Sequence, residues 1–275
     1  MIGEYEIPKG SKLYFGASAR QKRHIENQSA EILSEAGFEE IVTPLFSYHQ
    51  GDLRDRKVIR FGDESNHAVA LRADSALEVV RLILKRLGRS TDQRKWFYIQ
   101  PVLHYPTTET HQIGAESIGS ESLPEMIALS ARLLESFGAE ATLQVGSIAV
   151  CEEVSRLLGQ PIEALFGHQL HHLLDSKEPW VAPLARLSDL AELPGVIEKV
   201  PTSLKVPLSK MGEIAKAANW PKVALSPLYY GQMSYYDDLY FRFIHGNHLL
   251  AMGGDYESGE GRASGFALYT DALLN

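Results

Sequence analysis

Two polar residues four positions apart, Gln112 and Glu116, are the part of this sequence best equipped to bind a small ligand. Side chains alternate between the two faces of a β-strand, so residues four apart on a strand project from the same face. An amide and a carboxylate on one face offer acceptors to the N–H groups of an ammonium or imidazolium ligand. Similar residues also line the exposed face of many antiparallel sheets, so the pair alone is a weak signal.

The stretch that leads into this pair, Phe97 to Thr110, contains no arginine and no lysine. Such cations are the usual partners of nucleotide phosphates, and they stabilise the charge that develops during phosphate chemistry. The pattern therefore suits an amino acid better than a nucleotide, and it favours binding over catalysis.

Three other places in the chain carry residues that suit a ligand pocket. Asp74 directly precedes a predicted helix, where its carboxylate either caps the helix or faces a cleft. Tyr235 precedes a predicted C-terminal hairpin, and Gly253, Gly254 and Tyr256 follow it. Paired glycines let the backbone approach a ligand closely. Each of these residues also fits an ordinary cap, turn or core position.

The composition is that of a globular protein, with 275 residues, of which 44% are hydrophobic and 23% charged. A formal net charge of -8 argues against a nucleic-acid partner, because that affinity comes mainly from clustered lysine and arginine. The single cysteine, Cys151, lies in an apolar helical pattern and indicates a core residue in a reducing compartment. Without a signal-peptide pattern or a membrane-span pattern, we expect a cytoplasmic protein with no membrane partner.

The spacing of apolar residues predicts alternating helices and short strands. Helices are predicted at 17–36, 75–87, 122–137 and 148–158, and strands at 38–46, 58–61, 67–71, 96–103, 110–117 and 141–145. A C-terminal hairpin is predicted at 239–244 and 249–252, and a helical, irregular insertion at about 161–221. Ser122 and Glu125 have the form of a capping box. We expect one α+β domain over 1–275, a mostly antiparallel sheet flanked by helices.

In their order along the chain, five segments resemble the catalytic core of the class II histidyl-tRNA synthetases. The unit ending at Pro44 is similar to motif 1, Phe97–Gly119 to motif 2, and Gly265–Leu268 to the start of motif 3. Leu71–Asp74 resembles the family's Leu-Arg-Pro-Glu, and Ala251–Tyr256 its glycine-rich histidine motif. Five matches in the correct order are far more specific than one. The resemblance covers nearly the whole chain and implies the class II synthetase-like fold.

Two arginines with which these synthetases bind ATP phosphates have no counterpart here. Their motif 2 begins Phe-Arg-x-Glu, whereas this chain has Phe97–Gln100, with Tyr98 in the place of the arginine. Their motif 3 ends near Gly-Leu-Glu-Arg, whereas this chain has Ala272, with the acidic Asp271 beside it. Losing one such donor costs about 3 kcal/mol in the transition state, so we expect no adenylation activity, no catalytic residues and no cofactor.

The residues that contact histidine in the synthetases are largely kept as residue types. Asp74 and Gln112 match the groups that face the α-amino group, Glu116 and Tyr235 match those that reach the imidazole, and Tyr256 matches the aromatic residue after the glycine pair. The resemblance therefore implies a histidine site.

The same comparison identifies two departures and a candidate loop. Ala76 stands in place of a threonine, and Tyr229 or Tyr230 in place of an arginine near the substrate carboxylate. Gly253 and Gly254 form the candidate ligand-contacting loop.

A synthetase-like core without these arginines, and without an anticodon-binding domain, resembles the regulatory subunits of short-form ATP phosphoribosyltransferase. The resemblance implies a non-catalytic subunit that activates the catalytic subunit and conveys feedback inhibition by histidine in the first step of histidine biosynthesis. It also implies self-association through a class II-type dimer interface within a hetero-oligomer. Such allostery requires histidine to bind two arrangements of the complex differently.

Three alternatives stay open at this point. An active class II ligase would need relocated phosphate contacts, and a stand-alone histidine-binding protein would need no enzyme partner. A metal hydrolase could use His168, His171 and His172, of which the first and third lie one helical turn apart. Because no H-E-x-x-H pattern and no evident third ligand accompany them, we expect no metal site.

Overall fold

The computed structural model describes residues 3, 5–48, 58–88, 90–119, 122–162, 171–230, 236–257 and 261–274, without the side chains of 171 and 172. The chain divides into two compact units. The first comprises Met1–Gly119, Ser258–Gly261 and Gly265–Asn275, and the second Ser120–Glu257 and Arg262–Ser264. The prediction of one domain over 1–275 is not decided by this division and stays a prediction.

Helix α1 (Gly16–Glu35) opens the first unit and confirms the helix predicted at 17–36. Its buried face includes Ile25 and Leu33, which follow the predicted apolar spacing. Gly37 follows with a φ of 85°, the left-handed conformation that commonly ends a helix.

The single strand predicted at 38–46 is wrong in part, because the segment forms two short strands, β1 (Glu39–Glu40) and β2 (Phe46–Ser47). Pro44 has no N–H to donate to a sheet ladder. Its carbonyl accepts a 3.3 Å hydrogen bond from Arg72 Nη1. A side chain from another part of the unit thus satisfies this backbone where a strand partner would otherwise be needed.

The main sheet of the first unit has the strand order β1-β5-β6-β11. The other strands are β5 (Lys95–His104), β6 (Thr108–Ile118) and β11 (Arg262–Tyr269), of which Gly265 and the residues after it belong to this unit. The short 3-10 helix η4 (Thr270–Leu273) follows β11. β5 and β6 are antiparallel, and their register pairs Tyr98 with Gly114. The strands predicted at 96–103 and 110–117 are therefore confirmed.

A smaller sheet in the same unit has the order β2-β4-β3. Its hairpin, β3 (Arg60–Gly62) and β4 (Ala68–Leu71), confirms the one predicted from the sequence. The predicted helix at 75–87 is also confirmed, as α2 (Ala76–Leu82) followed by the π-helical turn η2 (Ile83–Leu87).

The second unit contains a sheet with the order β10-β9-β7-β8. Its strands are β7 (Thr142–Ser147), β8 (Val223–Leu225), β9 (Tyr236–His245) and β10 (His248–Glu257). The predicted C-terminal hairpin is confirmed as β9 and β10, which turn at Gly246 with a φ of 54°. Most described strand pairs are antiparallel, with parallel exceptions at β1–β5 and β7–β8, which confirms the α+β class.

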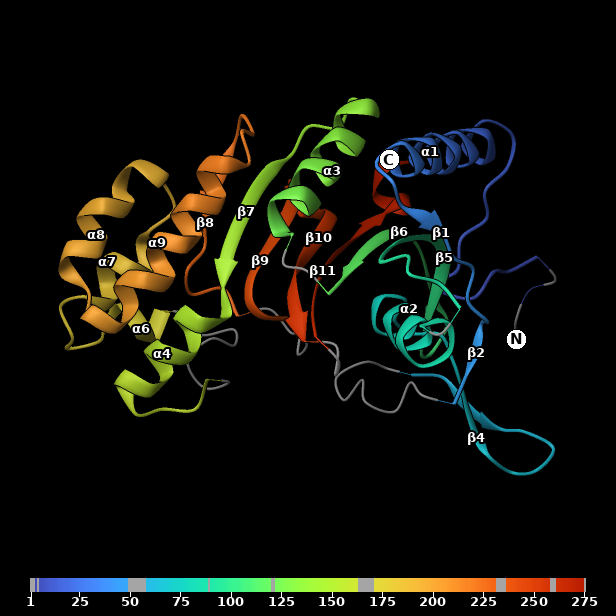
Figure 1. Cartoon of the computed structure of the whole chain (residues 1–275), viewed down its shortest axis with the longest axis horizontal. Helices are drawn as coiled ribbons and strands as arrows, with labels where there is room; N and C mark the ends of the chain where they lie inside the picture. The colour runs from blue at the N-terminus through green and yellow to red at the C-terminus, as the bar shows by residue number, and fades with distance from the viewer. Residues whose placement is uncertain are drawn as a thin grey trace. The chain divides into compact units, whose positions relative to one another are not determined.

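Helices α3 (Leu123–Ser136) and α4 (Ile148–Leu158) confirm two further predictions and pack against β10 and β9 respectively (Figure 1). The capping box predicted at the start of α3 is wrong, because the Ser122 side chain makes no cap hydrogen bond. Instead, the backbone N–H of Ser122 donates to Ser264 Oγ at 2.8 Å. A contact within the unit from a distant part of the sequence replaces the local cap.

The region predicted as a helical, irregular insertion is helical in the part that the structure describes. It contains α6 (His171–Leu174), α7 (Val181–Arg186), η3 (Leu190–Glu192), α8 (Leu193–Lys199) and α9 (Thr202–Ala217). Cys151 of α4 is fully buried, and burial, with a smaller effect of Glu152, raises the pKa of its thiol to about 12. Within the described ranges, no helix has both the length and the apolar character needed to cross a membrane.

Candidate ligand-binding site

Gln112 and Glu116 project from the same face of β6 and are both buried, with 5% and 0% of their surface exposed. Their burial excludes the interpretation of an exposed polar sheet face. A buried amide or carboxylate is stable only when partners satisfy it, so the surroundings of these two side chains define the site.

Tyr98 of β5 covers the floor between these two side chains. It is fully buried, and its ring lies over Gly114, where an added methyl group would approach the ring Cζ to 2.2 Å. Its hydroxyl donates to Glu116 Oε1 at 3.2 Å. The position that matches the missing motif 2 arginine therefore holds a neutral hydrogen-bond donor.

The other oxygen of Glu116 faces β11. A methyl group on Gly265 would lie 1.7 Å from Glu116 Oε2, so a residue with a side chain does not fit beside the carboxylate in this position. Tyr98 on one side and Gly265 on the other thus fix the direction of the carboxylate. The sequence indicated neither contact, because both join residues on different strands.

The amide of Gln112 lies opposite Gln100 of β5. Gln100 Oε1 accepts hydrogen bonds from the backbone N–H and the hydroxyl of Thr43, at 3.3 and 3.2 Å. Gln112 Oε1 is buried and has no hydrogen-bond partner among the described residues. A buried oxygen of this kind is a ready acceptor for a ligand N–H.

Asp74 caps helix α2, which confirms the simpler of its two interpretations. Its Oδ1 accepts a 3.1 Å hydrogen bond from the backbone N–H of Leu77, and only 3% of the residue is exposed. Its predicted contact with the α-amino group of histidine stays a prediction.

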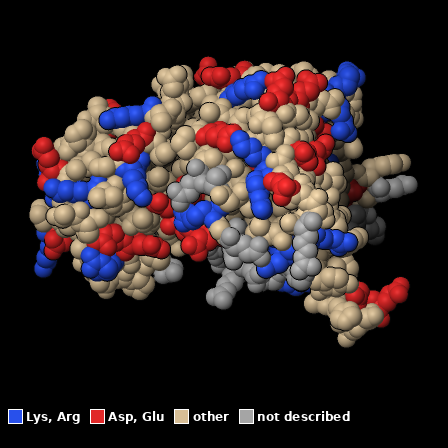
Figure 2. Space-filling view, in the orientation of Figure 1, with Lys and Arg blue, Asp and Glu red and all other residues tan. Residues whose placement is uncertain are grey.

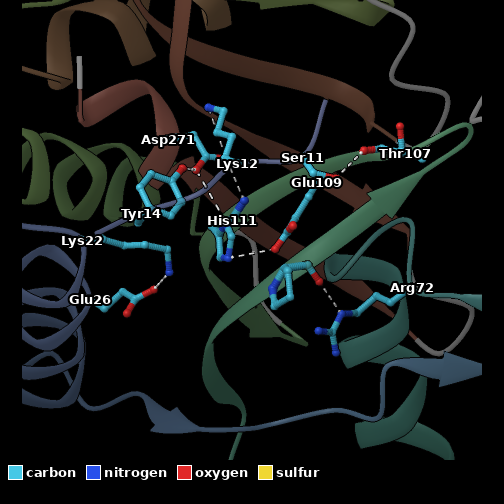
Figure 3. Close-up of polar contacts among 11 residues, drawn as sticks. Ser11, Lys12, Tyr14, Lys22, Glu26, Arg72, Thr107, Glu109, His111 and Asp271 are labelled. Carbon is cyan, nitrogen blue, oxygen red and sulfur yellow. Dashed lines mark hydrogen bonds and ion pairs between the residues drawn. The ribbon is translucent and has the colours of Figure 1, made fainter. Parts of the chain in front are cut away.

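Arg72 is a buried cation that fastens the segment after α1 to β5 (Figure 3). Its Nε donates to the carbonyl of Pro101 at 2.9 Å, and its Nη1 donates to the carbonyl and hydroxyl of Thr43 at 2.9 and 3.0 Å. Burial lowers the pKa of this guanidinium, and the charges of Glu78 and Tyr98 partly oppose the shift. These contacts give Arg72 a structural role beside the pocket.

Asp271, the acidic residue beside the missing motif 3 arginine, joins three segments of the first unit (Figure 3). It accepts hydrogen bonds from the Tyr14 hydroxyl and from the backbone N–H of His111, the latter at 3.0 Å. Lys12 Nζ lies 3.9 Å from Asp271 Oδ2, and the His111 ring lies between Asp271 and Glu109, at 3.5 and 3.4 Å. No sequence pattern indicated that Tyr14 and His111 lie together.

The pKa of Asp271 is held at about 2. Burial has the largest single influence and would raise this pKa, but the hydrogen bonds from His111 and Tyr14 and the charge of Lys12 together lower it. The same contact works in the opposite direction on Tyr14, whose pKa is raised by burial and by its hydrogen bond to Asp271.

Asp271→Asn is expected to make the protein less sensitive to acid. A carboxyl group with a lowered folded-state pKa contributes stability that is fully present above its unfolded pKa, near 3.8, and is lost as the pH falls towards about 2. With solvent screening considered, this contribution is on the order of 1 kcal/mol. Urea unfolding at about pH 5 and about pH 2.5 measures it. The exposed Asp92→Asn is the control, and equal acid sensitivity of the two variants would contradict the assignment.

The remaining predicted contacts lie in the second unit, except that Tyr235 lies outside the described residues. Tyr256 is buried and packs edge-on against Tyr236, with ring centres 6.4 Å apart. A methyl group on Gly254 would lie 2.6 Å from the Tyr236 ring, so this glycine allows close packing inside the hairpin, while Gly253 pairs with the neighbouring strand. Ligand contacts of these residues stay predictions.

Tyr229 lies against the guanidinium of Arg242, a contact that no sequence pattern indicated. It is one of the two candidates for the position of the carboxylate-facing arginine. The guanidinium of Arg242 lies 3.6 Å from the centre of the Tyr229 ring, and its Nε donates to Gln144 Oε1 at 2.9 Å. The Tyr229 carbonyl accepts a hydrogen bond from the Tyr240 hydroxyl. In the second unit, this tyrosine therefore takes part in packing between strands.

The metal-hydrolase alternative rests on His168, His171 and His172. His168 and the side chains of His171 and His172 lie outside the described residues. Elsewhere in the described ranges, no group of three or more histidine, cysteine or acidic side chains is arranged to hold a metal ion.

Comparison with known proteins gives consistent similarities over the whole chain. A family model described as histidyl-tRNA synthetase matches residues 14–273. The chain is 45% identical over 279 residues to an ATP phosphoribosyltransferase regulatory subunit of Wolinella succinogenes, covering 100% of this chain and 96% of that protein. A protein of the same name from Helicobacter hepaticus is 39% identical, with 100% and 98% covered.

One solved structure shows the same fold at lower sequence identity. It is a protein from Bacillus halodurans C, described as an ATP phosphoribosyltransferase regulatory subunit/histidyl-tRNA synthetase. The TM-score is 0.86 at 20% identity, and the match covers 100% of this chain and 83% of that chain.

Proposed function

The chain belongs to the histidyl-tRNA synthetase family and, within it, to the regulatory subunits of ATP phosphoribosyltransferase, and on this premise we propose that histidine acts on it through the pocket around Glu116. The fold is a class II synthetase-like catalytic core. The function is that of a non-catalytic subunit in histidine biosynthesis. The proposed part is the route by which histidine reaches the enzyme.

The observation that carries the proposal is the buried, oriented carboxylate of Glu116. Tyr98 donates to one of its oxygens, and Gly265 leaves space for the other. A carboxylate held in this way is a suitable acceptor for an imidazole N–H, because hydrogen bonds to charged acceptors are stronger than neutral ones. The neutral Tyr98, where the synthetases have a phosphate-binding arginine, supports a pocket used for sensing and not for adenylation.

Gln112 supports the second half of the proposed recognition. Its buried Oε1 has no partner among the described residues and lies on the same face of β6 as Glu116. We expect it to accept a hydrogen bond from the α-ammonium group of histidine. Asp74, Tyr235 and Tyr256 complete the proposed set of contacts, and Gly253 and Gly254 the proposed loop.

The proposed partners are the short-form catalytic subunit and a second copy of this chain, joined through a class II-type dimer interface in a cytoplasmic hetero-oligomer. Nucleic acid is not among them. On the face shown in Figure 2, acidic and basic side chains are interspersed over the described parts of each unit. The net charge of -8 also disfavours a phosphate backbone.

Reconstitution tests the proposed function directly. The purified chain is mixed with the short-form catalytic subunit, and formation of phosphoribosyl-ATP is measured while histidine is titrated. We expect faster turnover on mixing and inhibition as histidine rises. If the rate does not change on mixing, and the chain binds histidine alone, the stand-alone histidine-binding alternative is correct instead. Histidine-dependent exchange of pyrophosphate into ATP would support the ligase alternative.

A further inference from the structure

We propose that Gln100 of β5 binds the α-carboxylate of histidine, beside Gln112 of β6, which receives the α-ammonium group. The inference rests on the proposed histidine site. It deepens that proposal because it names the side chain that recognises the carboxylate, and with it the class of ligand, a free α-amino acid.

Gln100 and Gln112 present two complementary buried groups. The register of β5 and β6 places the two residues directly opposite each other, and each has 5% of its surface exposed. Directly opposed side chains lie on the same face of a sheet. Among the described residues, Gln100 Nε2 and Gln112 Oε1 have no hydrogen-bond partner. This face therefore carries one buried donor and one buried acceptor that make no bond, a costly state unless a partner satisfies them.

Thr43 determines which end of the Gln100 amide is the donor. The backbone N–H and the hydroxyl of Thr43 both donate to Gln100 Oε1, at 3.3 and 3.2 Å. A backbone N–H can only donate, so the atom that it faces must be the amide oxygen. The end of the amide that makes no bond is therefore the nitrogen, which carries two N–H donors.

Arg72 polarises this donor through Thr43. Its Nη1 donates to the Thr43 hydroxyl oxygen at 3.0 Å, so the hydroxyl proton is directed to Gln100. Hydrogen bonds in such a chain strengthen one another, and the first donor of this chain carries a positive charge. The Gln100 amide is thus a stronger donor at Nε2 than an isolated amide, which suits an anionic acceptor. Because the amide itself is neutral, it places no full positive charge beside the ammonium group of the same ligand.

The two free atoms match the two charged groups of an α-amino acid. Gln112 Oε1 can accept from the ammonium group, and Gln100 Nε2 can donate to the carboxylate, two groups that a single carbon atom joins. Glu116 lies four residues further along the same face of β6, where the imidazole is proposed to bind. An imidazole compound with an ammonium group but no carboxylate would therefore satisfy only one of the two amides.

Calorimetric titration of L-histidine and of histamine into the purified full chain tests the role of Gln100. Histamine keeps the imidazole and the ammonium group but has no carboxylate. Gln100→Met removes the amide and keeps the length of the side chain. We expect it to bind histidine about tenfold more weakly, as for the loss of a hydrogen bond to a charged group, and to bind histamine as before. A residue that only shaped the pocket would change both affinities alike, so the readout is their ratio.

Gln93→Met is the matched control. Gln93 Oε1 also accepts two hydrogen bonds, from the backbone N–H groups of Arg94 and Lys95 at 2.8 and 3.0 Å, but at the start of β5. Removing this amide should leave the affinities for histidine and for histamine unchanged.

Gln100→Glu reverses the preference between the two ligands. It keeps an oxygen for Thr43 and replaces the donor by an acceptor, and the two hydrogen bonds from Thr43 favour its ionised form. We expect histidine to bind at least about tenfold more weakly, because two carboxylates then face each other, and histamine to bind more tightly. Thermal unfolding of each variant shows whether it is folded. If methionine disturbs the fold, Gln100→Glu still decides the proposal.

Gln112→Met separates failure of the Gln100 role from failure of the proposed site. If it weakens histidine binding while the Gln100 variants keep the ratio of histidine to histamine affinity of the unchanged protein, the role of Gln100 is wrong and the site stands. If the unchanged protein binds no histidine, or if Gln112→Met and Glu116→Ala both bind it equally well, the site itself is wrong and the role of Gln100 falls with it.

Discussion

Replacement of Glu116 by alanine is expected to weaken histidine binding about a hundredfold, the upper range for removing a hydrogen bond to a buried charged group. The side chain is fully buried, its direction is fixed by Tyr98 and Gly265, and it is the proposed acceptor of the imidazole N–H. Inhibition of the reconstituted complex should therefore require correspondingly more histidine. The measurement is the histidine concentration that halves phosphoribosyl-ATP formation.

Two further variants make the Glu116 result interpretable. Glu116→Gln keeps the size of the side chain and an acceptor for Tyr98, so it distinguishes the loss of charge from the cavity that alanine leaves. Glu64→Ala removes an exposed carboxylate from the turn between β3 and β4 and should leave histidine inhibition unchanged. Full histidine sensitivity in Glu116→Ala would place the effector site elsewhere.

Replacement of Arg72 by alanine is expected to lower the free energy of unfolding by about 3 kcal/mol, because several buried acceptors lose a charged hydrogen-bond donor at once. Only 3% of Arg72 is exposed, and its guanidinium donates to carbonyl groups of Thr43, Pro44 and Pro101. Without it, these buried acceptors lose their donor. Urea unfolding followed by circular dichroism measures the change.

Arg72→Lys and Arg156→Ala are the comparisons for this experiment. Lysine keeps the charge but presents a single ammonium group and not a planar fork, so we expect an intermediate loss of stability. Arg156 pairs with Glu153 on the surface, with 66% of its side chain exposed, and its removal should have a much smaller effect. If Arg72→Ala and Arg156→Ala lose equal amounts of unfolding free energy, the buried hydrogen bonds of Arg72 do not hold Thr43 and Pro44 against β5.

The sequence predicted elements well where a local pattern determines them. Alternation along β6 placed Gln112 and Glu116 on one face, and apolar spacing located α1 and α4 to within a residue or so. These features depend on neighbours a few positions apart. The same pattern left open whether the polar face was exposed.

The sequence failed where a distant residue decides the outcome. The predicted strand at 38–46 is interrupted where Arg72 binds the backbone, and the Ser122 side chain makes no cap hydrogen bond, while its backbone N–H donates to the distant Ser264. Likewise, the burial of Glu116 depends on β5 and β11. The sequence shows a tyrosine, Tyr98, where the synthetases have an arginine, but it does not show the hydrogen bond from Tyr98 to Glu116.

The contacts of Asp271 connect segments from both ends of the first unit to β6, the strand that carries Gln112 and Glu116. Asp271 lies near the C-terminus, Tyr14 near the N-terminus, and the N–H that Asp271 binds belongs to His111, the residue directly before Gln112. A change at either end therefore affects the strand that carries both proposed histidine contacts. A shortened chain that begins after Tyr14 would lose the hydrogen bond from Tyr14 to Asp271, and we expect it to hold β6 less firmly beside the proposed ligand site.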